Sequence, residues 1–381
     1  MFQCGRLPRG RRRDGKRGVV MARVETGTRA PADLLGGPVE WRAQRDSSPR
    51  LSTAVIIPAY NAETVLGETL DSVAAQTLRP DEVIVVDDGS RDRTAAIAEA
   101  HPAVTRVIRK ANGGICAARN DAIESGSSDL VMPLDADDLW HPLYVERMVA
   151  MMSAHPEALS GFARWRGWLH PAESPAPFEA MVGDDIVMHD FASYDRAMLG
   201  GLPVLPSFHV ARRSALRKIG LRPYPEHQNM GEAAYMCGLL AAMGPVAEHV
   251  APLGRYRLHA NALTGDEIDA ARRVPPCLED LRRTIANRAD LGIDASVRRQ
   301  VDLHAAGWHR RCGRRLGGGG HVAEARRLLI QAAMLGDRRA MAMLAASLLP
   351  GVRRRVWVEA WRPDVVRREA GTEAWSLDRA G

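Results

Sequence analysis

Cysteine is scarce in this sequence, and no two cysteines lie close together. The chain has five cysteines among 381 residues and no CxxC pair. Such spacing provides neither the paired thiolates of a zinc site nor the framework of a disulfide-stabilised domain. We therefore expect reduced thiols and a cytoplasmic protein. The five residues are Cys4, Cys116, Cys237, Cys277 and Cys312.

Long apolar runs are also absent. No stretch reaches the roughly 18 apolar residues that a membrane-spanning helix needs. The basic opening of the chain lacks the apolar centre of a secretory signal. These absences predict a protein that does not span a membrane.

Two phosphate-binding signatures are missing after the first apolar run, which begins at Ala54. No GxGxxG motif follows it, which disfavours a nucleotide dehydrogenase. The stretch from Val55 to Glu63 also lacks the Gly- and Lys/Arg-rich loop that we expect of a nucleotidyl transferase. Both of these enzyme classes are therefore poor candidates.

The positive charge of the chain is concentrated at its two ends. Lys and Arg exceed Asp and Glu by six, with basic clusters in the first twenty residues and between Arg298 and Arg368. The basic and aromatic segment 348–361 suits a helix that lies on an anionic membrane surface. A solvated basic helix against the rest of the chain is an equal alternative. We expect no nucleic-acid partner.

A regular alternation of apolar runs and amphipathic stretches begins at Thr53. Wholly apolar runs are typical of strands that are buried on both faces. Between these runs lie stretches whose apolar residues recur at helical spacing. This pattern predicts an α/β fold, with a parallel or mixed sheet covered by helices. The expected strands are 54–58, 83–87, 105–108 and 130–134, and the expected helices are 62–75, 93–100, 115–124 and 142–154.

The remaining segments give weaker signals. Residues 1–50, rich in Arg, Gly, Pro and Ser, are predicted to be a disordered leader. The central domain is expected to end near residue 265, and a helical extension to occupy 266–381. Within these parts we expect a strand at 207–210, helices at 231–243, 321–335 and 338–349, and a flexible break at Gly317–Gly320.

Polar residues stand where the expected strands end. They are Pro58-Ala-Tyr-Asn61, Asp87-Asp-Gly-Ser90 and Asp135-Ala-Asp-Asp138. The carboxyl ends of parallel strands meet at one edge of a sheet, where ligands bind. Carboxylates gathered there would repel one another unless a cation lay among them, and oxygen ligands favour Mg²⁺ or Mn²⁺ over zinc. Taken singly, each motif is equally typical of a turn or a helix cap.

Five motifs occur in order between Thr53 and His259. They are Val55-Ile-Ile-Pro-Ala-Tyr-Asn-Ala-Glu63, Val85-Val-Asp-Asp-Gly-Ser90, Asn112-Gly-Gly, Ala118-Arg-Asn120 and Leu134-Asp-Ala-Asp-Asp138. This series resembles the family 2 glycosyltransferases, which are inverting enzymes of GT-A fold. The resemblance implies a nucleotide-sugar half at 51–158 and an acceptor half at 159–265. It also implies transfer of a sugar from a nucleotide diphosphate, with a UDP-sugar as the expected donor.

The resemblance assigns donor-binding roles to residues of these motifs. Pro58, Tyr60 and Asp88 would line the nucleobase pocket, and Asp88 would accept a hydrogen bond from the base. Asn61 and Glu63 belong to the same nucleotide-sugar site. Arg119 would contact the nucleotide, the alternative being an ordinary surface arginine of a helix.

The acidic motif is assigned to the ribose and a metal ion. Asp135 would lie near the ribose and serve with Asp137 as a ligand of Mn²⁺ or Mg²⁺, and Asp138 would be an alternative ligand or a support. His259 is a weaker candidate ligand, because a lone histidine is more often structural. The cation would stabilise the charge that develops on the departing diphosphate.

The resemblance also implies a carboxylate base in the second half of the central domain. The family places Gly-Glu-Asp at the start of a helix, and this chain has Gly231-Glu-Ala233. Glu232 is therefore the expected base, although an acid at a helix N-terminus is favourable without any catalytic role. Because Ala233 replaces the second acid, a degenerate protein that binds nucleotide or partners without turnover is the alternative.

The remaining expectations concern the acceptor and the setting. The acceptor would be a saccharide, a lipid-linked molecule or another hydroxyl compound, as in polysaccharide biosynthesis. Trp140, Trp165 and Trp168 could stack on sugar faces, although core packing is the commoner fate of tryptophan. We expect a cytoplasmic protein with peripheral membrane contact through its basic C-terminal helices.

Overall fold

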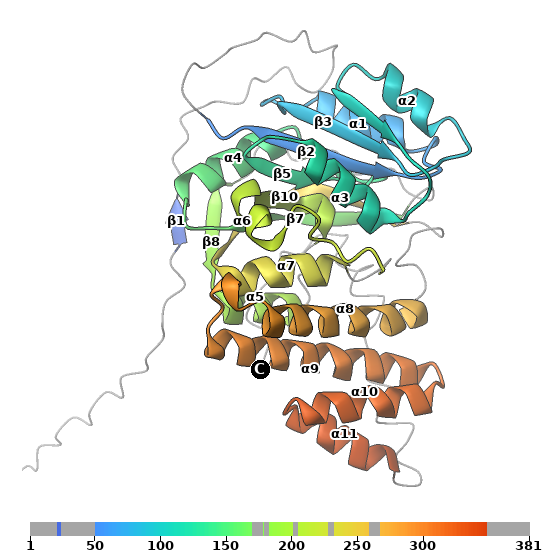
Figure 1. Cartoon of the computed structure of the whole chain (residues 1–381), viewed down its shortest axis with the longest axis vertical. Helices are drawn as coiled ribbons and strands as arrows, with labels where there is room; N and C mark the ends of the chain where they lie inside the picture. Colours follow the sequence, from blue (N-terminus) through green and yellow to red (C-terminus); the bar gives the residue numbers. More distant parts are fainter. Residues whose placement is uncertain are drawn as a thin grey trace, which may run out of the picture.

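A computed structural model describes most of the chain from Arg50 onward, and its strands form one mixed sheet covered by helices (Figure 1). The strand order is β1-β8-β10-β7-β9-β5-β2-β3-β4, and β6 pairs with β10. The expected fold class is confirmed. The described residues are 21–23, 50–169, 178, 183–200, 205–227, 232–258 and 267–348.

The first half of the sheet is parallel, as the alternation predicted. Its strands are β2 (Thr53–Ala59), β3 (Glu82–Asp87), β4 (Arg106–Arg109) and β5 (Leu130–Pro133). β2 pairs with both β3 and β5, so their carboxyl ends lie side by side. The helices that follow these strands are α1 (Leu66–Ala74), α2 (Thr94–Ala100), α3 (Ile115–Ser125) and α4 (Tyr144–Ala154).

The second half of the sheet was largely invisible in the sequence. Antiparallel β9 (His209–Arg212) joins β5 to the long β7 (Ser160–Leu169), which runs parallel to β10 (Val246–Leu258). β10 carries buried charged residues, so its pattern is not that of an apolar strand. β6 (Leu139–Trp140), β8 (Asp185–His189) and β1 (Met21–Arg23) complete the sheet.

Buried charges in β10 are stabilised by pairing with neighbouring strands. Glu248 accepts hydrogen bonds from Arg164 of β7 at 2.7 Å and pairs with His189 of β8 at 2.8 Å. A buried ionised group is tolerated when it is paired and hydrogen-bonded in this way. The pairing explains why a strand with so many charges lies inside the sheet.

Helices stack in successive layers below the sheet (Figure 1). α7 (Glu232–Met243) lies next to the sheet, followed by α8 (Glu267–Asn287), α9 (Ala295–Gly318), α10 (Val322–Met334) and α11 (Arg338–Leu348). Of two further helices, α6 (Arg213–Ile219) directly follows β9, and α5 (Phe191–Gly200) packs against α9 and also contacts α7 and β8. No described helix combines the length and apolar content needed to cross a bilayer.

The expected break at Gly317–Gly320 is wrong in position. α9 continues to Gly318, and the chain turns at Gly320, whose φ of 90° suits glycine. A helix can include several glycines when neighbouring residues of the same helix pack into a core. Here Leu316, in the last turn of α9, is buried. Only the end of the glycine run therefore acts as a break.

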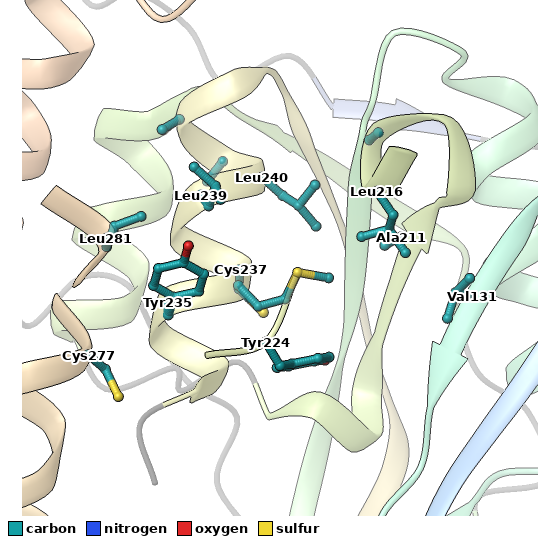
Figure 2. Packing of buried hydrophobic residues seen from close by; sticks show 14 of the residues in the cluster. Val131, Ala211, Leu216, Tyr224, Tyr235, Cys237, Leu239, Leu240, Cys277 and Leu281 are labelled. Atoms are coloured by element: carbon teal, nitrogen blue, oxygen red, sulfur yellow. The ribbon is translucent and has the colours of Figure 1, made fainter. Parts of the chain in front are cut away.

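Two apolar clusters lie on opposite faces of the sheet. Alternate residues of each strand point to opposite faces, so Ile56 joins one cluster while Val55 and Ile57 join the other. Figure 2 shows the first cluster, in which Leu239 and Leu240 of α7 lie between the sheet and Leu281 of α8. α8 and α9 thus share a core with the sheet. The expected domain boundary near residue 265 stays a prediction.

Two buried histidines predict acid-sensitive stability. Burial lowers the pKa of His209 to about 4, and burial together with the charge of Arg147 lowers the pKa of His249 to about 4. Below about pH 6.5 the unfolded chain therefore binds protons that the folded chain does not. The free energy of unfolding should fall by about 1.4 kcal/mol per pH unit for each histidine as the pH drops from 6.5 toward 4.

Denaturant unfolding at a series of pH values measures this dependence. His209→Asn and His249→Asn should each reduce the slope of stability against pH, whatever they do to stability at neutral pH. His321→Asn, at a partly exposed position before α10, is the matched control. If the slope of stability against pH were unchanged in both the His209 and the His249 variants, the attribution of the acid sensitivity to these two histidines would be contradicted.

Candidate functional site

The acidic motif forms a short loop between β5 and β6, which we call the DxD loop (Asp135–Asp138). Two contacts from other parts of the chain and one within the loop fix its backbone. The Thr69 hydroxyl of α1 donates to the Ala136 carbonyl at 2.9 Å, and the Asp135 N–H donates to the Ser207 hydroxyl at 3.1 Å. Within the loop, the Asp138 N–H donates to the Asp135 carbonyl at 3.2 Å. The loop is therefore held in one conformation at the carboxyl end of the parallel strands.

Arg119 holds the first acid of the loop. Its guanidinium is fully buried in α3 and forms an ion pair with Asp135, whose side chain is 24% exposed. It also lies over the ring of Tyr224, 5.3 Å from the ring centroid. The alternative of an ordinary surface arginine is thereby excluded. Arg119 and Asp135, assigned from separate motifs, are direct partners.

Arg257 holds the other end of the loop from β10. Its side chain is 1% exposed, and its Nε donates to the Asp137 carbonyl at 2.7 Å. Its backbone N–H donates to the Asp138 carboxylate at 3.0 Å, and its guanidinium pairs with Glu68 of α1 at 2.6 Å. Sequence reasoning missed this residue. The sequence pointed only to His259, two residues further along the chain.

Trp168 of β7 completes the surroundings of Arg257. The guanidinium lies 4.8 Å from the centroid of the Trp168 ring, which is itself buried. Such a contact between a cation and an aromatic face is favourable, and more so when water is excluded. The position of the DxD loop thus depends on β10, β7 and α1 together.

Asp138 differs from the other two acids of the loop. Its side chain is completely buried, and burial raises the pKa of its carboxyl well above the usual range, with further contributions from the charges of Asp137 and Asp135. The Ser207 hydroxyl and the Arg257 N–H offset part of this effect. Asp137, by contrast, is only partly buried. The geometry suits Asp138 for supporting the loop and leaves Asp137 nearer to solvent.

The Asp87-Asp-Gly-Ser90 motif forms a compact junction with the Asn112-Gly-Gly motif. Asp88 is 3% exposed, and its two carboxylate oxygens accept hydrogen bonds from the Gly113 and Gly114 N–H groups at 2.9 and 2.8 Å. Lys110 lies 3.6 Å away. Asp88 therefore positions the start of α3, and its expected hydrogen bond to a nucleobase would use the remaining acceptor capacity of the carboxylate.

Gly89 is required at this junction. Its φ of 80° lies in the left-handed region, and an added Cβ would approach the Asn112 nitrogen to 2.8 Å. Both observations exclude an ordinary side chain. The glycine of the Asp87-Asp-Gly-Ser90 motif thus has a structural explanation that spacing alone did not supply.

The motif after β2 provides both exposed and supporting groups. Pro58 is buried within β2, whereas the Tyr60 side chain that follows is 49% exposed. Asn61, with φ of 49°, accepts a hydrogen bond from the Arg91 N–H, and Glu63 accepts one from the Arg93 N–H. Asn61 and Glu63 therefore fix the loop that presents Tyr60. Their expected contact with the donor stays a prediction.

The structure joins these motifs at one edge of the sheet. Asp88 binds Gly114 at the start of α3, and Arg119 of the same helix binds Asp135. Five residues of α-helix span about 7.5 Å. The two acidic motifs are thus connected through little more than one turn of helix. They lie in neighbouring parts of one site rather than in separate regions.

Several of these carboxylates already have partners within the protein. Asp88 already accepts two backbone N–H groups, Asp135 has Arg119, and Asp138 has the Arg257 N–H. Within the described residues, no group of three or more acids, histidines or cysteines is arranged to hold a metal ion. A metal at this edge would take one or two carboxylates and further ligands from phosphate and water, which suits Mg²⁺ in particular.

Comparison with known proteins identifies this region. Residues 54–220 match the model of glycosyl transferase family 2. We call residues 54–220, which are similar to this family, the family 2 domain. The matched segment contains Asp88, Arg119 and the DxD loop, but it ends before Glu232 and Arg257.

Curated relatives of the family 2 domain are similar over short segments. The uncharacterized glycosyltransferase EpsJ of Bacillus subtilis is 41% identical over 88 residues, which are 22% of this chain and 26% of EpsJ. Glycosyltransferase GlyA of Streptococcus pneumoniae is 36% identical over 97 residues, 25% of this chain and 14% of GlyA. The chain therefore matches only about a quarter or less of the length of these relatives.

Solved structures share the fold over more of the chain. S. aureus TarS residues 1–349, solved in complex with UDP-GlcNAc, align with a TM-score of 0.55 and 18% identity over 81% of this chain and 89% of that one. The mannosyltransferase PcManGT of Pyrobaculum calidifontis, solved with GDP-Man and Mn²⁺, aligns with a TM-score of 0.51 and 21% identity, covering 85% of this chain and 87% of that one. These likenesses show the GT-A fold.

The tryptophans near the family 2 domain's acidic loop have structural partners. The Trp140 side chain is 1% exposed, stacks on Tyr144 and donates its indole N–H to the Ser207 carbonyl. Trp168 is buried beneath Arg257, and Trp165 packs against Phe208 and Tyr256. Core packing therefore accounts for Trp140 and Trp168. Trp165 is only partly buried.

Two expected site residues lie at the limit of the described chain. Glu232 begins α7, but its side chain is outside the described residues, as is His259 after β10. The expected leader and the basic segment 349–381 also lie outside them, apart from residues 21–23 of the leader and Arg50, which precedes β2. The described cysteines Cys116, Cys237, Cys277 and Cys312 are all buried.

Proposed function

We propose that this chain is an inverting glycosyltransferase that moves a sugar from a nucleotide diphosphate donor to an acceptor hydroxyl. One observation carries the proposal: the DxD loop is fixed by Arg119 and Arg257 at the edge where Asp88 organises the start of α3. Solved neighbours of the same fold bind UDP-GlcNAc or GDP-Man. A UDP-sugar is the donor that we expect here.

The donor would lie along the carboxyl edge of β2, β3 and β5. Tyr60 is exposed at the start of this edge and can cover the nucleobase, while the base and ribose would meet Asp88 and Asp135. Because Arg119 neutralises Asp135 and fixes its rotamer, that carboxylate can accept ribose hydroxyls without first reorganising. The diphosphate would then reach Asp137.

A divalent cation fits the acids of the DxD loop when the donor completes its ligand set. Asp137 and Asp135 would hold it, and Mn²⁺ accompanies the donor in one structural neighbour. When bound, the ion would supply positive charge for the departing nucleotide diphosphate. Asp138 and Arg257 would keep the loop from moving as that charge develops.

The acceptor hydroxyl must lose a proton as it attacks the anomeric carbon. Glu232 is the proposed base because it stands at the first turn of α7, as the family resemblance implies. Inversion needs a single displacement, so this proton is the one that a protein group has to accept during sugar transfer. The alanine at position 233 leaves Glu232 to perform this role alone.

Glu232→Gln should retain donor affinity and lose sugar transfer by about 10²–10⁴-fold, the usual contribution of a general base. Donor turnover and calorimetric affinity for UDP-sugars in Mn²⁺ measure the two properties separately. Glu99→Gln, at an exposed position in α2, is the matched control. Full activity of Glu232→Gln would remove Glu232 as the base.

A second candidate function is binding of the nucleotide donor without catalysis. The replacement of the second acid by Ala233 is the feature that favours a degenerate, nucleotide-binding protein. Metal-dependent donor binding by the wild-type chain, with neither hydrolysis nor transfer of any tested UDP-, GDP- or dTDP-sugar, would support it. Turnover of a donor in Mn²⁺ would establish the enzyme.

The cellular location and the acceptor are also part of the proposal. We expect a cytoplasmic enzyme whose acceptor is a saccharide, a lipid-linked molecule or another hydroxyl compound. Membrane contact through the basic C-terminal residues is expected from the sequence, and segment 349–381 lies outside the described residues.

A further inference from the structure

Exposed apolar side chains are concentrated on the last two helices of the described chain. Six large apolar or aromatic side chains are exposed in the described residues, and four of them lie on α10 and α11, where each is between 47% and 82% exposed. Figure 1 shows these helices at the end of the helical stack, on the side away from the sheet. We call residues 322–348 the terminal hairpin. The four residues are Ile330, Met334, Met341 and Leu348.

We propose that the outer face of the terminal hairpin binds an anionic lipid surface. The proposal rests on the proposed function, in which membrane contact is expected, and names the surface of the protein and the kind of lipid that make this contact. Two features carry it: a continuous apolar stripe along α11 and the positive charge beside that stripe.

The exposed apolar residues of α11 recur at helical spacing and form one stripe along its outer side. The opposite side packs inward, where Ala340 and Ser347 are buried. Arg326 of α10 holds this inner side, because its guanidinium donates to the hydroxyl and the carbonyl of Ser347. The apolar stripe therefore faces away from the rest of the described chain. It consists of Met341, Ala342, Ala345 and Leu348.

α10 adds apolar surface beside the turn of the hairpin. Met334 ends α10, and α11 begins four residues later at Arg338, so the two residues lie at the same end of the hairpin. Ile330 lies one turn before Met334, on the same side of α10. The exposed apolar surface thus includes residues of both helices.

Exposed arginines lie beside this apolar surface. Arg338 and Arg339 are exposed in the first turn of α11, and Arg327 is exposed on α10. The sequence that follows Leu348 continues the trend, since residues 349–362 contain four arginines and one acid. Basic residues therefore accompany the stripe at both ends of α11.

The two acids of the terminal hairpin do not offset this charge at its outer face. Glu324 pairs with Arg272 of α8 at 2.8 Å, and Asp337 pairs with Arg310 of α9 at 2.7 Å. Both acids are thus neutralised by arginines of the preceding helices. The charge that the hairpin presents to its surroundings is therefore positive.

An anionic bilayer matches this combination better than other partners. Apolar side chains flanked by arginines are typical of helices that lie in the membrane interface, and anionic headgroups attract the arginines. Nucleic acid would contact the arginines but leave the apolar stripe in water. A second copy of the chain packed on the same face would bring the arginines of both copies together, and like charges across an interface repel.

Vesicle flotation with the full chain tests the proposal. The probes are vesicles of phosphatidylcholine alone and vesicles of phosphatidylcholine mixed with phosphatidylglycerol, each at low and at physiological salt. The wild-type chain should bind the mixed vesicles, and salt should weaken this binding because it screens the arginines. Binding to phosphatidylcholine alone should be much weaker.

The double variant Met341→Gln with Leu348→Gln should lower the partition into mixed vesicles by about tenfold or more, equivalent to about 1.4 kcal/mol. The reason is that two apolar side chains of the stripe are lost without any change in charge. Leu303→Gln, at an exposed apolar position of α9, is the matched control and should bind like the wild type. The Tm values should be similar, because all three positions are exposed.

A second double variant, Arg338→Gln with Arg339→Gln, tests the role of charge. It should weaken binding to the mixed vesicles by about fivefold for each arginine and reduce the dependence on salt. Arg217→Gln with Lys218→Gln, an exposed adjacent pair in α6, is the matched control and should leave vesicle binding unchanged.

Equal partition of the Met341→Gln, Leu348→Gln variant and of Leu303→Gln would overturn the proposal. Failure of the wild-type chain to bind the mixed vesicles would also refute it. A wild-type dimer, detected by light scattering without lipid and dissociated by the stripe variant, would assign the stripe to a second copy instead. Vesicle binding needs no nucleotide sugar, so absence of donor turnover would contradict the proposed enzyme and leave these results unaffected.

Discussion

Asp137→Ala is expected to lower the turnover of a UDP-sugar by about 10³-fold and to remove the dependence of donor binding on Mn²⁺. Within the DxD loop, Asp135 forms an ion pair with Arg119 and Asp138 is completely buried, whereas the Asp137 side chain is only partly buried. A metal ion stabilises transition-state charge by several kcal/mol, and about 4 kcal/mol corresponds to a 10³-fold change in rate. Calorimetric affinity with and without Mn²⁺, together with kcat, measures both effects.

Asp290→Ala is the matched control for Asp137→Ala. Asp290 is an exposed acid between α8 and α9, paired with Arg288 and remote in sequence from the motifs. Both variants should melt near the wild-type temperature, because neither removes an apolar core residue. If Asp137→Ala kept its Mn²⁺-dependent affinity, the assignment of Asp137 as the principal metal ligand would be refuted.

Arg257→Lys should lower kcat by about 10²-fold and raise the Mn²⁺ concentration needed for half-maximal activity. The guanidinium bonds the Asp137 carbonyl and Glu68 at once, through different nitrogens. A lysine keeps the charge but cannot reproduce this forked geometry. Because small displacements of a catalytic loop can cost about 10²-fold in rate, the lost contact should be visible in activity rather than in folding alone.

Arg282→Lys provides the comparison for Arg257→Lys. The Arg282 guanidinium likewise has two partners, the carboxylates of Glu279 and Asp302, but it joins α8 to α9. Glu68→Gln should shift the Mn²⁺ requirement in the same direction as Arg257→Lys, since it weakens the same clamp. A purely structural role for Arg257 would instead lower Tm in proportion to activity and leave the Mn²⁺ requirement unchanged.

The parallel half of the sheet was predictable because its strands are chemically uniform. Residues 54–57 and 83–86 are buried on both faces, so nearly every position is apolar and the strand is evident from composition alone. The helices between these strands end within a few residues of their expected positions. The acidic motifs were predictable for the same reason, since they follow directly where these strands end.

Apart from β9, which overlaps the strand expected at 207–210, the second half of the sheet could not be predicted from local pattern. β10 contains Glu248, His249, Arg255 and Arg257, all of them buried. A buried charge is stable only when its partner is present, and the partners of Glu248 and Arg257 come from other strands and from α1. Such partners are close in space and distant in sequence, so the sequence of β10 alone resembles a surface segment.

Arg257 illustrates what this limit means for the site. The motif series located Asp137 and Asp138, but the residue that bonds both follows them by more than a hundred positions. Arg119 was found in the sequence and assigned to the nucleotide. Its structural partner is Asp135, so any contribution to donor binding would act partly through that carboxylate.

Calorimetric titration of the wild-type chain with UDP-, GDP- and dTDP-sugars, in Mn²⁺ and after chelation, tests the central claim most directly. That claim is that the acids fixed at the carboxyl edge of the parallel strands bind a nucleotide diphosphate together with a divalent ion. We expect a UDP-sugar to bind in Mn²⁺ and to lose its affinity after chelation. Binding of equal strength without metal, or no binding of any donor, would contradict the account.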